Sequence, residues 1–190
     1  MSKTCHVRRP RQSSWKSRYR ERKVNCYHRP VIEYVFCDGS FAPQRNIGVG
    51  AMLHLSGPEW EPSKNQGSFA IQTRVMESTS IARVELLTVL WALSDVGPLP
   101  GVNLFTDCQM IENLSGRRAK LEAANYKSKR TGLSLANADL YQKFFEVYDE
   151  VHPVIHWIKG HTATSRQNEF HRVFSFVDRA ARKALREHIL

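Results

Sequence analysis

The stretch VIEYVFCDGS, residues 31–40, decides the fold of this chain, because it predicts a buried strand that delivers a carboxylate. Its first seven residues are mostly apolar, and their β-branched and aromatic side chains suit a pleated, largely buried segment. Asp38 comes next, and Gly39 and Ser40 are residue types typical of turns. We therefore expect the strand to end at Asp38, with its carboxylate facing a partner at that end.

The rest of the chain alternates strand and helix patterns. Further strands are predicted at 46–55, 67–75, 102–107 and 154–158. Helices are predicted at 78–97, 108–114, 135–151 and over 176–189. Gly48 and Gly50 in the second strand indicate a bulge or a close approach of another backbone. This order predicts an α/β fold, a five-stranded mixed sheet flanked by helices, over residues 31–190.

Positive charge is concentrated in two segments of this chain, whose net charge is +10. Residues 1–30 hold ten Lys and Arg against one acid, and we expect them to form a flexible basic extension. Residues 117–133 hold six Lys and Arg against one acid. Two cationic segments on an otherwise mildly acidic body indicate a polyanionic partner, with nucleic acid as the first candidate.

Composition also limits where the protein works. No run approaches the roughly 18 apolar residues of a membrane span, and the first thirty residues lack the apolar core of a secretory signal. The four cysteines show no spacing typical of a disulfide framework. We expect a cytoplasmic protein with reduced thiols, no membrane association and a monomeric state.

Acidic residues recur where the predicted core elements can bring them together. Asp107 follows a short strand as Asp38 does, and Glu85 and Asp178 interrupt apolar stretches of two helices. At about 4 Å and an effective dielectric of about 20, each like-charged pair costs on the order of 4 kcal/mol. Oxygen ligands without a Cys or His set favour Mg²⁺ or Mn²⁺, and two such ions can clamp a phosphodiester.

Each acid also has a purely structural interpretation. Asp38 before Gly-Ser suits a turn, and Asp107 suits the N-cap of the helix predicted after it. Glu85 and Asp178 can be solvated helix positions. The combination of all four in this order is what favours a metal site.

Five short blocks in this order resemble the type 1 ribonuclease H family. They are DGS at 38–40, RVEL at 83–86, TDCQ at 106–109, WIKGH at 157–161 and VDRAARKAL at 177–185. The segment 137–144 resembles the family stretch that follows its basic handle, and 117–133 resembles the handle itself. The resemblance covers residues 31–188 and implies an RNase H-like fold. It also implies Mg²⁺-dependent cleavage of RNA in RNA–DNA hybrids, leaving 3′-hydroxyl and 5′-phosphate ends.

The resemblance assigns roles to individual residues. Asp38, Glu85, Asp107 and Asp178 would bind two Mg²⁺ ions, with Mn²⁺ as a possible substitute, and carry catalysis. His161 would aid proton transfer or product departure, which suits a side chain that titrates near neutral pH. Contacts to the hybrid would come from the polar residues Ser40, Ser80 and Gln109 and from the handle residues Arg117, Arg118, Lys120, Lys127, Lys129 and Arg130.

The chain departs from the family pattern at two places. Ile81 and Ala82 stand before RVEL, where the family usually has two polar amides that read the minor groove of the hybrid. The stretch between His161 and Asp178 is also longer than the family pattern. Because the residues after Asp178 match better, we take it as the fourth acid and keep Glu169 as the alternative.

The basic extension has several interpretations. Trp15, Tyr19 and Tyr27 lie among its Arg and Lys residues, a combination that suits stacking and phosphate attraction in further nucleic-acid binding. A disordered solubility tail, an organellar presequence, or a zinc site at its Cys-His pairs are the alternatives.

Two other functions use the same residues. A related nuclease or strand-transfer enzyme would apply the four acids to DNA or structured RNA, since fold does not fix substrate. A nucleic-acid-binding module that has lost cleavage is the third possibility, and the retained acids argue against it.

Overall fold

The structure is a computed structural model that describes residues 31–57, 69–160 and 162–190. Its strands are β1 (Ile32–Ala42), β2 (Ile47–Gly57), β3 (Gln72–Glu77), β4 (Val102–Thr106) and β5 (Val154–Trp157). Its α-helices are α1 (Ile81–Val96), α2 (Gln109–Glu112), α3 (Leu114–Ala123), α4 (Ala138–Val151) and α5 (Glu169–Ile189). The predicted basic extension, residues 1–30, lies outside the described residues.

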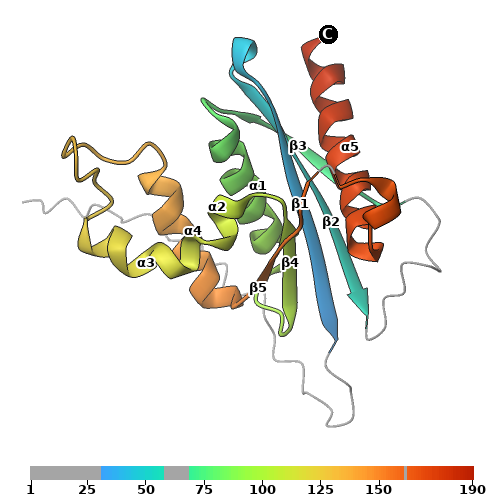
Figure 1. Ribbon diagram of the computed structural model, residues 1–190, viewed down its shortest axis with the longest axis horizontal. Helices are drawn as coiled ribbons and strands as arrows, with labels where there is room; N and C mark the ends of the chain where they lie inside the picture. The colour runs from blue at the N-terminus through green and yellow to red at the C-terminus, as the bar shows by residue number, and fades with distance from the viewer. Residues whose placement is uncertain (1–30, 58–68, 161) are drawn as a thin grey trace, which may run out of the picture.

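The five strands form one mixed sheet, as the sequence predicts, and their order in it is β3-β2-β1-β4-β5. β1 pairs antiparallel with β2 and parallel with β4, and β4 pairs parallel with β5. The sheet therefore places the C-terminal end of β4 beside the middle of β1 (Figure 1).

The expected end of β1 at Asp38 is wrong. The strand continues to Ala42, and Asp38, Gly39 and Ser40 all pair with β2. The parallel pairing with β4, by contrast, stops at Phe36. Because β2 supplies a complete antiparallel partner, the ladder overrides the local turn preference of Gly39-Ser40. Asp38 therefore lies on a rigid strand, just beyond the point where β4 ends.

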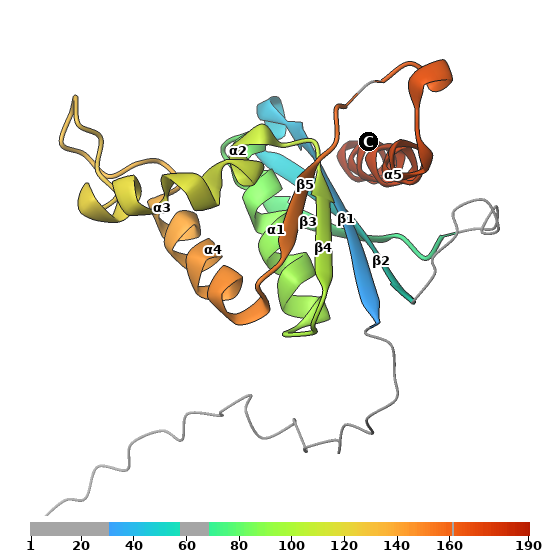
Figure 2. The same cartoon turned by 60° about the horizontal axis from the view of Figure 1, so that its bottom comes forward.

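Helices cover both faces of the sheet. α1 and α4 lie on one face, and α5 lies on the other, as Figure 2 shows. Alternation along β1 supplies both cores, since Val35 and Cys37 belong to the cluster with α1 and α4, whereas Phe36 packs with α5. This two-residue period is what a strand buried on both faces requires.

The glycines of β2 allow α1 to lie close to the sheet. A Cβ at Gly48 would come 2.2 Å from Cγ2 of Val84, and one at Gly50 would come 2.2 Å from Oγ1 of Thr88. A close approach is found at both positions, but it is made by side chains of α1 rather than by a backbone, and it brings α1 near enough for its side chains to reach β1.

Several predicted boundaries move in the structure. The third strand runs from 72 to 77 rather than from 67 to 75, and α5 begins at Glu169, seven residues before the predicted helix. The first part of the basic insert, not predicted as a helix, forms α3, with Leu114 and Leu121 buried. Ser80 caps α1 by accepting a hydrogen bond from the backbone N–H of Arg83. No helix within the described residues has the length and apolar character needed to cross a bilayer.

Candidate active site

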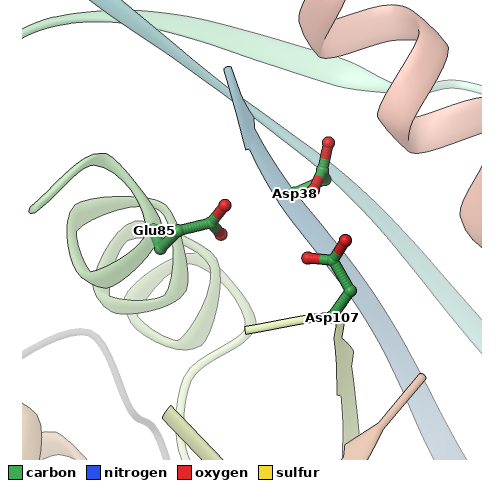
Figure 3. A group of neighbouring side chains, drawn as sticks. All are labelled: Asp38, Glu85 and Asp107. Atoms are coloured by element: carbon green, nitrogen blue, oxygen red, sulfur yellow. The ribbon is translucent and has the colours of Figure 1, made fainter. Parts of the chain in front are cut away.

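Three carboxylates meet at the edge of the sheet where β4 ends. Asp38, Glu85 and Asp107 each offer an oxygen, and the three oxygens lie within 4.8 Å of one another. Figure 3 shows the side chains pointing toward one another from β1, from α1 and from the residue that follows β4. We call these three residues the carboxylate cluster.

Local sequence explains why Glu85 reaches Asp38. Gly39 has no side chain, and a Cβ there would lie 3.1 Å from Cδ and Oε1 of Glu85. A larger residue at 39 would push α1 or the Glu85 side chain away from β1. The Asp-Gly pair that looked like a turn in the sequence is therefore a strand segment with room for an acid from the neighbouring helix.

The backbone next to Asp107 is held by side chains from two sides. Nε1 of Trp157 donates a hydrogen bond to the Asp107 carbonyl at 2.9 Å, and Oγ1 of Thr106 accepts one from the Cys108 N–H at 3.2 Å. Gly160 lies against the carboxylate itself, since a Cβ there would come 2.5 Å from Oδ2 of Asp107. The WIKGH block thus fixes the position of this acid from the end of β5.

Burial and mutual repulsion raise the pKa values of two acids of the carboxylate cluster, Asp38 and Glu85. Asp38 is 5% exposed, and its burial, followed by the charges of Asp107 and Asp178, raises its pKa to about 8. Burial likewise raises the pKa of Glu85 well above its usual range, with the charges of Asp38 and Asp107 as further causes. Without a divalent ion, Asp38 therefore holds a proton at neutral pH, and a bound divalent ion would replace that proton.

The cluster fits a divalent cation chemically. Oε2 of Glu85 is inaccessible to solvent and has no hydrogen-bond partner in the described part of the chain, although such atoms are usually satisfied. The donor set consists of carboxylate oxygens, which hard cations of the Mg²⁺ and Mn²⁺ type prefer. Burial raises the pKa of the neighbouring Cys108 thiol to about 11, so it remains protonated and does not compete as a thiolate ligand.

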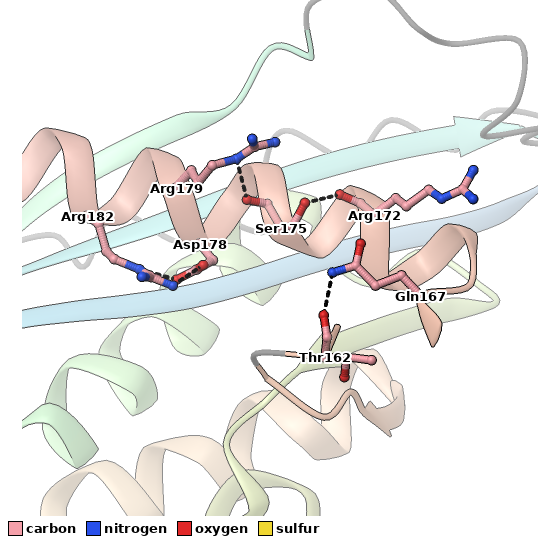
Figure 4. A network of polar contacts seen from close by, with 7 residues as sticks. All are labelled: Thr162, Gln167, Arg172, Ser175, Asp178, Arg179 and Arg182. Carbon is pink, nitrogen blue, oxygen red and sulfur yellow. Dashed lines mark hydrogen bonds and ion pairs between the residues drawn. The ribbon is translucent and has the colours of Figure 1, made fainter. Parts of the chain in front are cut away.

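Asp178 borders the cluster from α5. It lines the same cavity as Asp38, Glu85 and Asp107, and its charge contributes to the raised pKa of Asp38. Arg182, one turn further along α5, binds it through two hydrogen bonds, of which the Nε–Oδ1 contact is 2.6 Å (Figure 4). The four predicted acids therefore line one cavity, but three form the tight cluster and the fourth is engaged by an arginine.

The alternative acid lies elsewhere on the same helix. Glu169 occupies the first turn of α5, nine residues before Asp178, and is not among the residues lining the cavity. This placement favours Asp178. His161, the predicted loop histidine, lies outside the described residues.

The predicted polar contacts to nucleic acid lie around the cluster. Ser40 lines the cavity itself, and Ile81, 45% exposed, lines it from the start of α1. Ser80 is half-buried because its hydroxyl caps α1, and Gln109 is exposed at the start of α2. Ser40 and Gln109 flank the acids from β1 and α2.

The handle residues divide into two groups. Arg118 is fully engaged: it donates to Asp149 at 2.6 and 2.9 Å and to Glu122 at 2.8 Å, and it lies 5.0 Å from the Phe145 ring centre. The other five, all exposed, have no carboxylate partner within the described residues: Arg117, Lys120, Lys127, Lys129 and Arg130. Arg118 therefore fastens α3 to α4, and the remaining five face solvent.

Sequence reasoning missed Arg182 and Gly160 as site residues. The Asp178-Arg182 spacing of four residues is a signal for an ion pair on one helix face, once the helix is known to extend through both. The contact between Gly160 and Asp107 has no signal in the sequence, because it depends on where β5 ends relative to β4.

Comparison with known proteins gives consistent matches. The RNase H family profile matches residues 31–186. A protein named Ribonuclease H from Nitratidesulfovibrio vulgaris (strain DSM 19637 / Miyazaki F) is 31% identical over 137 residues, which cover 67% of this chain and 76% of the relative.

Solved structures share the fold. LC9-RNase H1, described as a type 1 RNase H with the type 2 active-site motif, superposes with a TM-score of 0.59 at 17% identity, covering 83% of this chain and 73% of that one. The PFV RNase H domain has a TM-score of 0.57 at 15% identity, covering 81% and 94%. A foamy viral protease-reverse transcriptase solved with an RNA/DNA hybrid gives 0.57 at 7% identity, covering 88% of this chain and 21% of that one.

Proposed function

Because this chain belongs to the ribonuclease H family, we propose that it is a metal-dependent endoribonuclease that hydrolyses the RNA strand of RNA–DNA hybrids. The observation that carries the proposal is the convergence of Asp38, Glu85 and Asp107 within 4.8 Å at one edge of the sheet. Family membership and this acidic cluster point to the same reaction: hydrolysis of a phosphodiester, with products ending in 3′-hydroxyl and 5′-phosphate groups.

The carboxylate cluster, together with Asp178, would hold two divalent ions, and we propose Mg²⁺, with Mn²⁺ as a substitute. Bound ions of this kind activate a water nucleophile and stabilise the leaving oxygen of a phosphodiester. The protein's own contribution is placement: Asp38 comes from a strand paired along its length, Glu85 from a helix packed on that strand, and Asp107 from the end of β4.

Two side chains, His161 and Asp38, would take part in proton transfer in this proposal. His161 would aid proton transfer or product departure, as the family resemblance implies. Asp38, with a pKa of about 8 before cations bind, would release its proton when they enter.

Recognition of the hybrid would come from groups around the cluster and from the handle. Ser40, Ser80 and Gln109 would contact the strand near the cleaved bond, where an A-form-like hybrid offers 2′-hydroxyls to protein groups. The exposed handle cations would contact phosphates without reading sequence: Arg117, Lys120, Lys127, Lys129 and Arg130. That a related polymerase was solved with an RNA/DNA hybrid supports this substrate class.

Residues 31–190 would thus form one catalytic domain with its basic handle, and residues 1–30 an extension that adds nucleic-acid affinity. We propose that the enzyme acts as a monomer in the cytoplasm. The free thiols of Cys37 and Cys108 are consistent with a reducing compartment.

One assay separates this function from its alternatives. End-labelled RNA–DNA hybrid, duplex RNA and duplex DNA are each incubated with the protein and Mg²⁺, alongside Asp107→Asn. We expect cleavage of hybrid RNA alone, and a fall of at least a thousandfold in the variant, because a ligand carboxylate becomes a neutral amide. Cleavage of duplex DNA would favour a related nuclease, and binding without cleavage in either Mg²⁺ or Mn²⁺ would favour a binding module.

A further inference from the structure

A second cleft adjoins the cavity of the carboxylate cluster. Its volume is about 480 Å³, and it runs between the segment after β5 and the first half of α5. Asp107 and Asp178 line both spaces, so the cleft continues directly from the acidic site. Its floor is apolar, formed by the buried Ile158 and Phe174.

The wall of this cleft is the part of the chain that departs from the family pattern. The stretch before Asp178 is longer than the pattern, and in the structure it forms the first two and a half turns of α5, Glu169 to Val177. The cleft therefore exists because α5 begins well before its acid. The cleavage chemistry proposed above makes no use of it.

Three cations around this cleft have no acidic partner in the described part of the chain: Lys159, Arg172 and Arg179. Arg83, Arg118 and Arg182, by contrast, are paired with carboxylates. Unpaired cations gathered at one cleft attract an anion.

Arg179 is held in place to meet such an anion. Its Nε donates to the carbonyl of Ser175 at 3.0 Å, and its guanidinium carbon lies 4.6 Å from the ring centre of Phe176, which is 44% exposed. These two contacts leave its terminal amino groups available. Figure 4 shows Arg172 and Arg179 leaving α5 at separate points, apart from the Asp178–Arg182 pair.

The spacing of these arginines fits a phosphate chain. Seven residues separate Arg172 from Arg179, which is about 10 Å along the helix axis, so they face successive anionic groups better than one. A row of cations beside an exposed aromatic ring is typical of grooves that bind single-stranded nucleic acid, where phosphates meet the charges and bases stack. At Asp107 and Asp178, the cleft opens into the cavity of the acids that would hold the cleaved phosphodiester.

We propose that this cleft binds the RNA strand on one side of the cleaved bond, with Arg172 and Arg179 contacting its phosphates. The proposal rests on the hybrid-cleaving function above and adds a subsite to it. It gives the enzyme a preference for hybrids whose RNA continues past the duplex at one end.

The test compares Arg172→Gln/Arg179→Gln with a control of equal charge change on the same helix, Lys183→Gln/Arg186→Gln, whose residues line neither cleft. Steady-state cleavage is measured on a blunt hybrid and on the same hybrid with about eight extra nucleotides on the RNA or on the DNA strand, at either end. For RNA extended at one end, we expect the first variant to raise KM roughly tenfold with kcat within twofold. Its log–log salt slope should be shallower by about 1.4, the value for two single-strand phosphate contacts.

Several results would overturn the proposal. One is an equal KM for wild type and the cleft variant on RNA-extended hybrid. Another is a rise in KM that is just as large on blunt hybrid or that occurs only with DNA extensions. A third is the same rise in KM in the control variant. If wild type cleaves no hybrid, the proposed function fails instead. In that case, fluorescence anisotropy with labelled single-stranded RNA still tests the cleft, and unchanged affinity in the cleft variant would exclude it as an RNA site.

Discussion

Arg182 donates through Nε to Oδ1 of Asp178 at 2.6 Å, and both residues line the cavity of the carboxylate cluster. The site thus contains a cation of its own, because Arg182 lies four residues after Asp178 on α5 and binds it. The arginine lowers the pKa of Asp38 by its charge, against the raising effects of Asp107 and Asp178. A divalent ion that uses Asp178 must therefore compete with this guanidinium.

Replacing this arginine tests the competition. We expect Arg182→Gln to lower the Tm of the metal-free protein, because Asp178, Asp38 and Asp107 lose a cation that interacts with them. Mg²⁺ should then raise the Tm of the variant more than that of wild type, since the ion no longer displaces a guanidinium. Thermal unfolding across a Mg²⁺ titration, with Arg186→Gln as the matched control, measures both effects. An identical Mg²⁺-induced shift in variant and wild type would rule out competition.

The buried acid Asp38 makes the metal-free protein less stable as pH rises. Its folded-state pKa is about 8, above the value of about 3.9 for an unfolded aspartate. Between these values the folded state retains a proton that the unfolded state has released, so stability falls with rising pH. We expect Asp38→Asn to be more stable than wild type by up to about 5 kcal/mol at pH 8 and by about 1.5 kcal/mol at pH 5, because each pH unit between the two pKa values costs wild type about 1.4 kcal/mol. Urea unfolding in EDTA measures this.

Asp139 supplies the control of opposite sign. Arg83 binds it at 2.7 and 3.0 Å and lowers its pKa, so its contribution is present above the unfolded pKa and lost as pH falls through the folded pKa. Asp139→Asn should therefore lose stability at neutral pH and match wild type in strong acid. If Asp38→Asn instead lost stability at pH 8 in EDTA, repulsion within the cluster would not be the dominant force there.

The sequence predicted the layout of this fold well, because its signals were local and agreed with one another. The apolar β1 segment and the order of strand and helix patterns along the chain were enough to predict the mixed sheet. The end of β1 was wrong, because Gly39-Ser40 has turn preference alone but a ladder partner in β2. The start of α5 was missed, although Phe170, Val173, Phe174 and Val177 recur at helical spacing and pack into the core.

In the candidate site too, features that follow from local sequence were predicted, and features that depend on contacts between distant residues were not. Asp38, Glu85 and Asp107 were found from their positions on predicted elements, and the structure brings them together. The state of Arg118 was not predictable, because its acid Asp149 lies on another helix, 31 residues away. Charge counting treats every handle cation alike, whereas contacts across helices decide which ones remain available to a phosphate.

Gly160 is expected to be essential to activity though not to the fold. A Cβ at this position would come 2.5 Å from Oδ2 of Asp107, so the carboxylate must move away from the cluster. Since the neighbour is the end of a flexible side chain, we expect Gly160→Ala to leave the Tm nearly unchanged. Its Mg²⁺-dependent cleavage rate should fall at least tenfold.

Gly116→Ala in α3 is the matched control for Gly160→Ala. A Cβ there meets no atom within 4 Å, and alanine favours the helix by up to about 1 kcal/mol over glycine. This variant should keep full activity and gain stability. If Gly160→Ala kept wild-type activity, Asp107 would tolerate displacement. If its Tm fell strongly, the added methyl group would be displacing the backbone around residue 160 rather than the Asp107 side chain.

Arg118 and the lysines of the handle should behave differently on substitution. Arg118 binds Asp149 and Glu122 and lies over Phe145, so Arg118→Gln should lower the Tm by loosening α3 from α4. Lys127→Gln/Lys129→Gln should leave the Tm unchanged, because both side chains are exposed and unpaired within the described residues. That variant should instead weaken hybrid binding and make its salt slope shallower by up to about 1.8, the value for two duplex phosphate contacts. Thermal unfolding and salt-dependent anisotropy on the same samples separate the two effects. A salt slope altered by Arg118→Gln with its Tm intact would mean that Arg118 leaves its acids to bind phosphate.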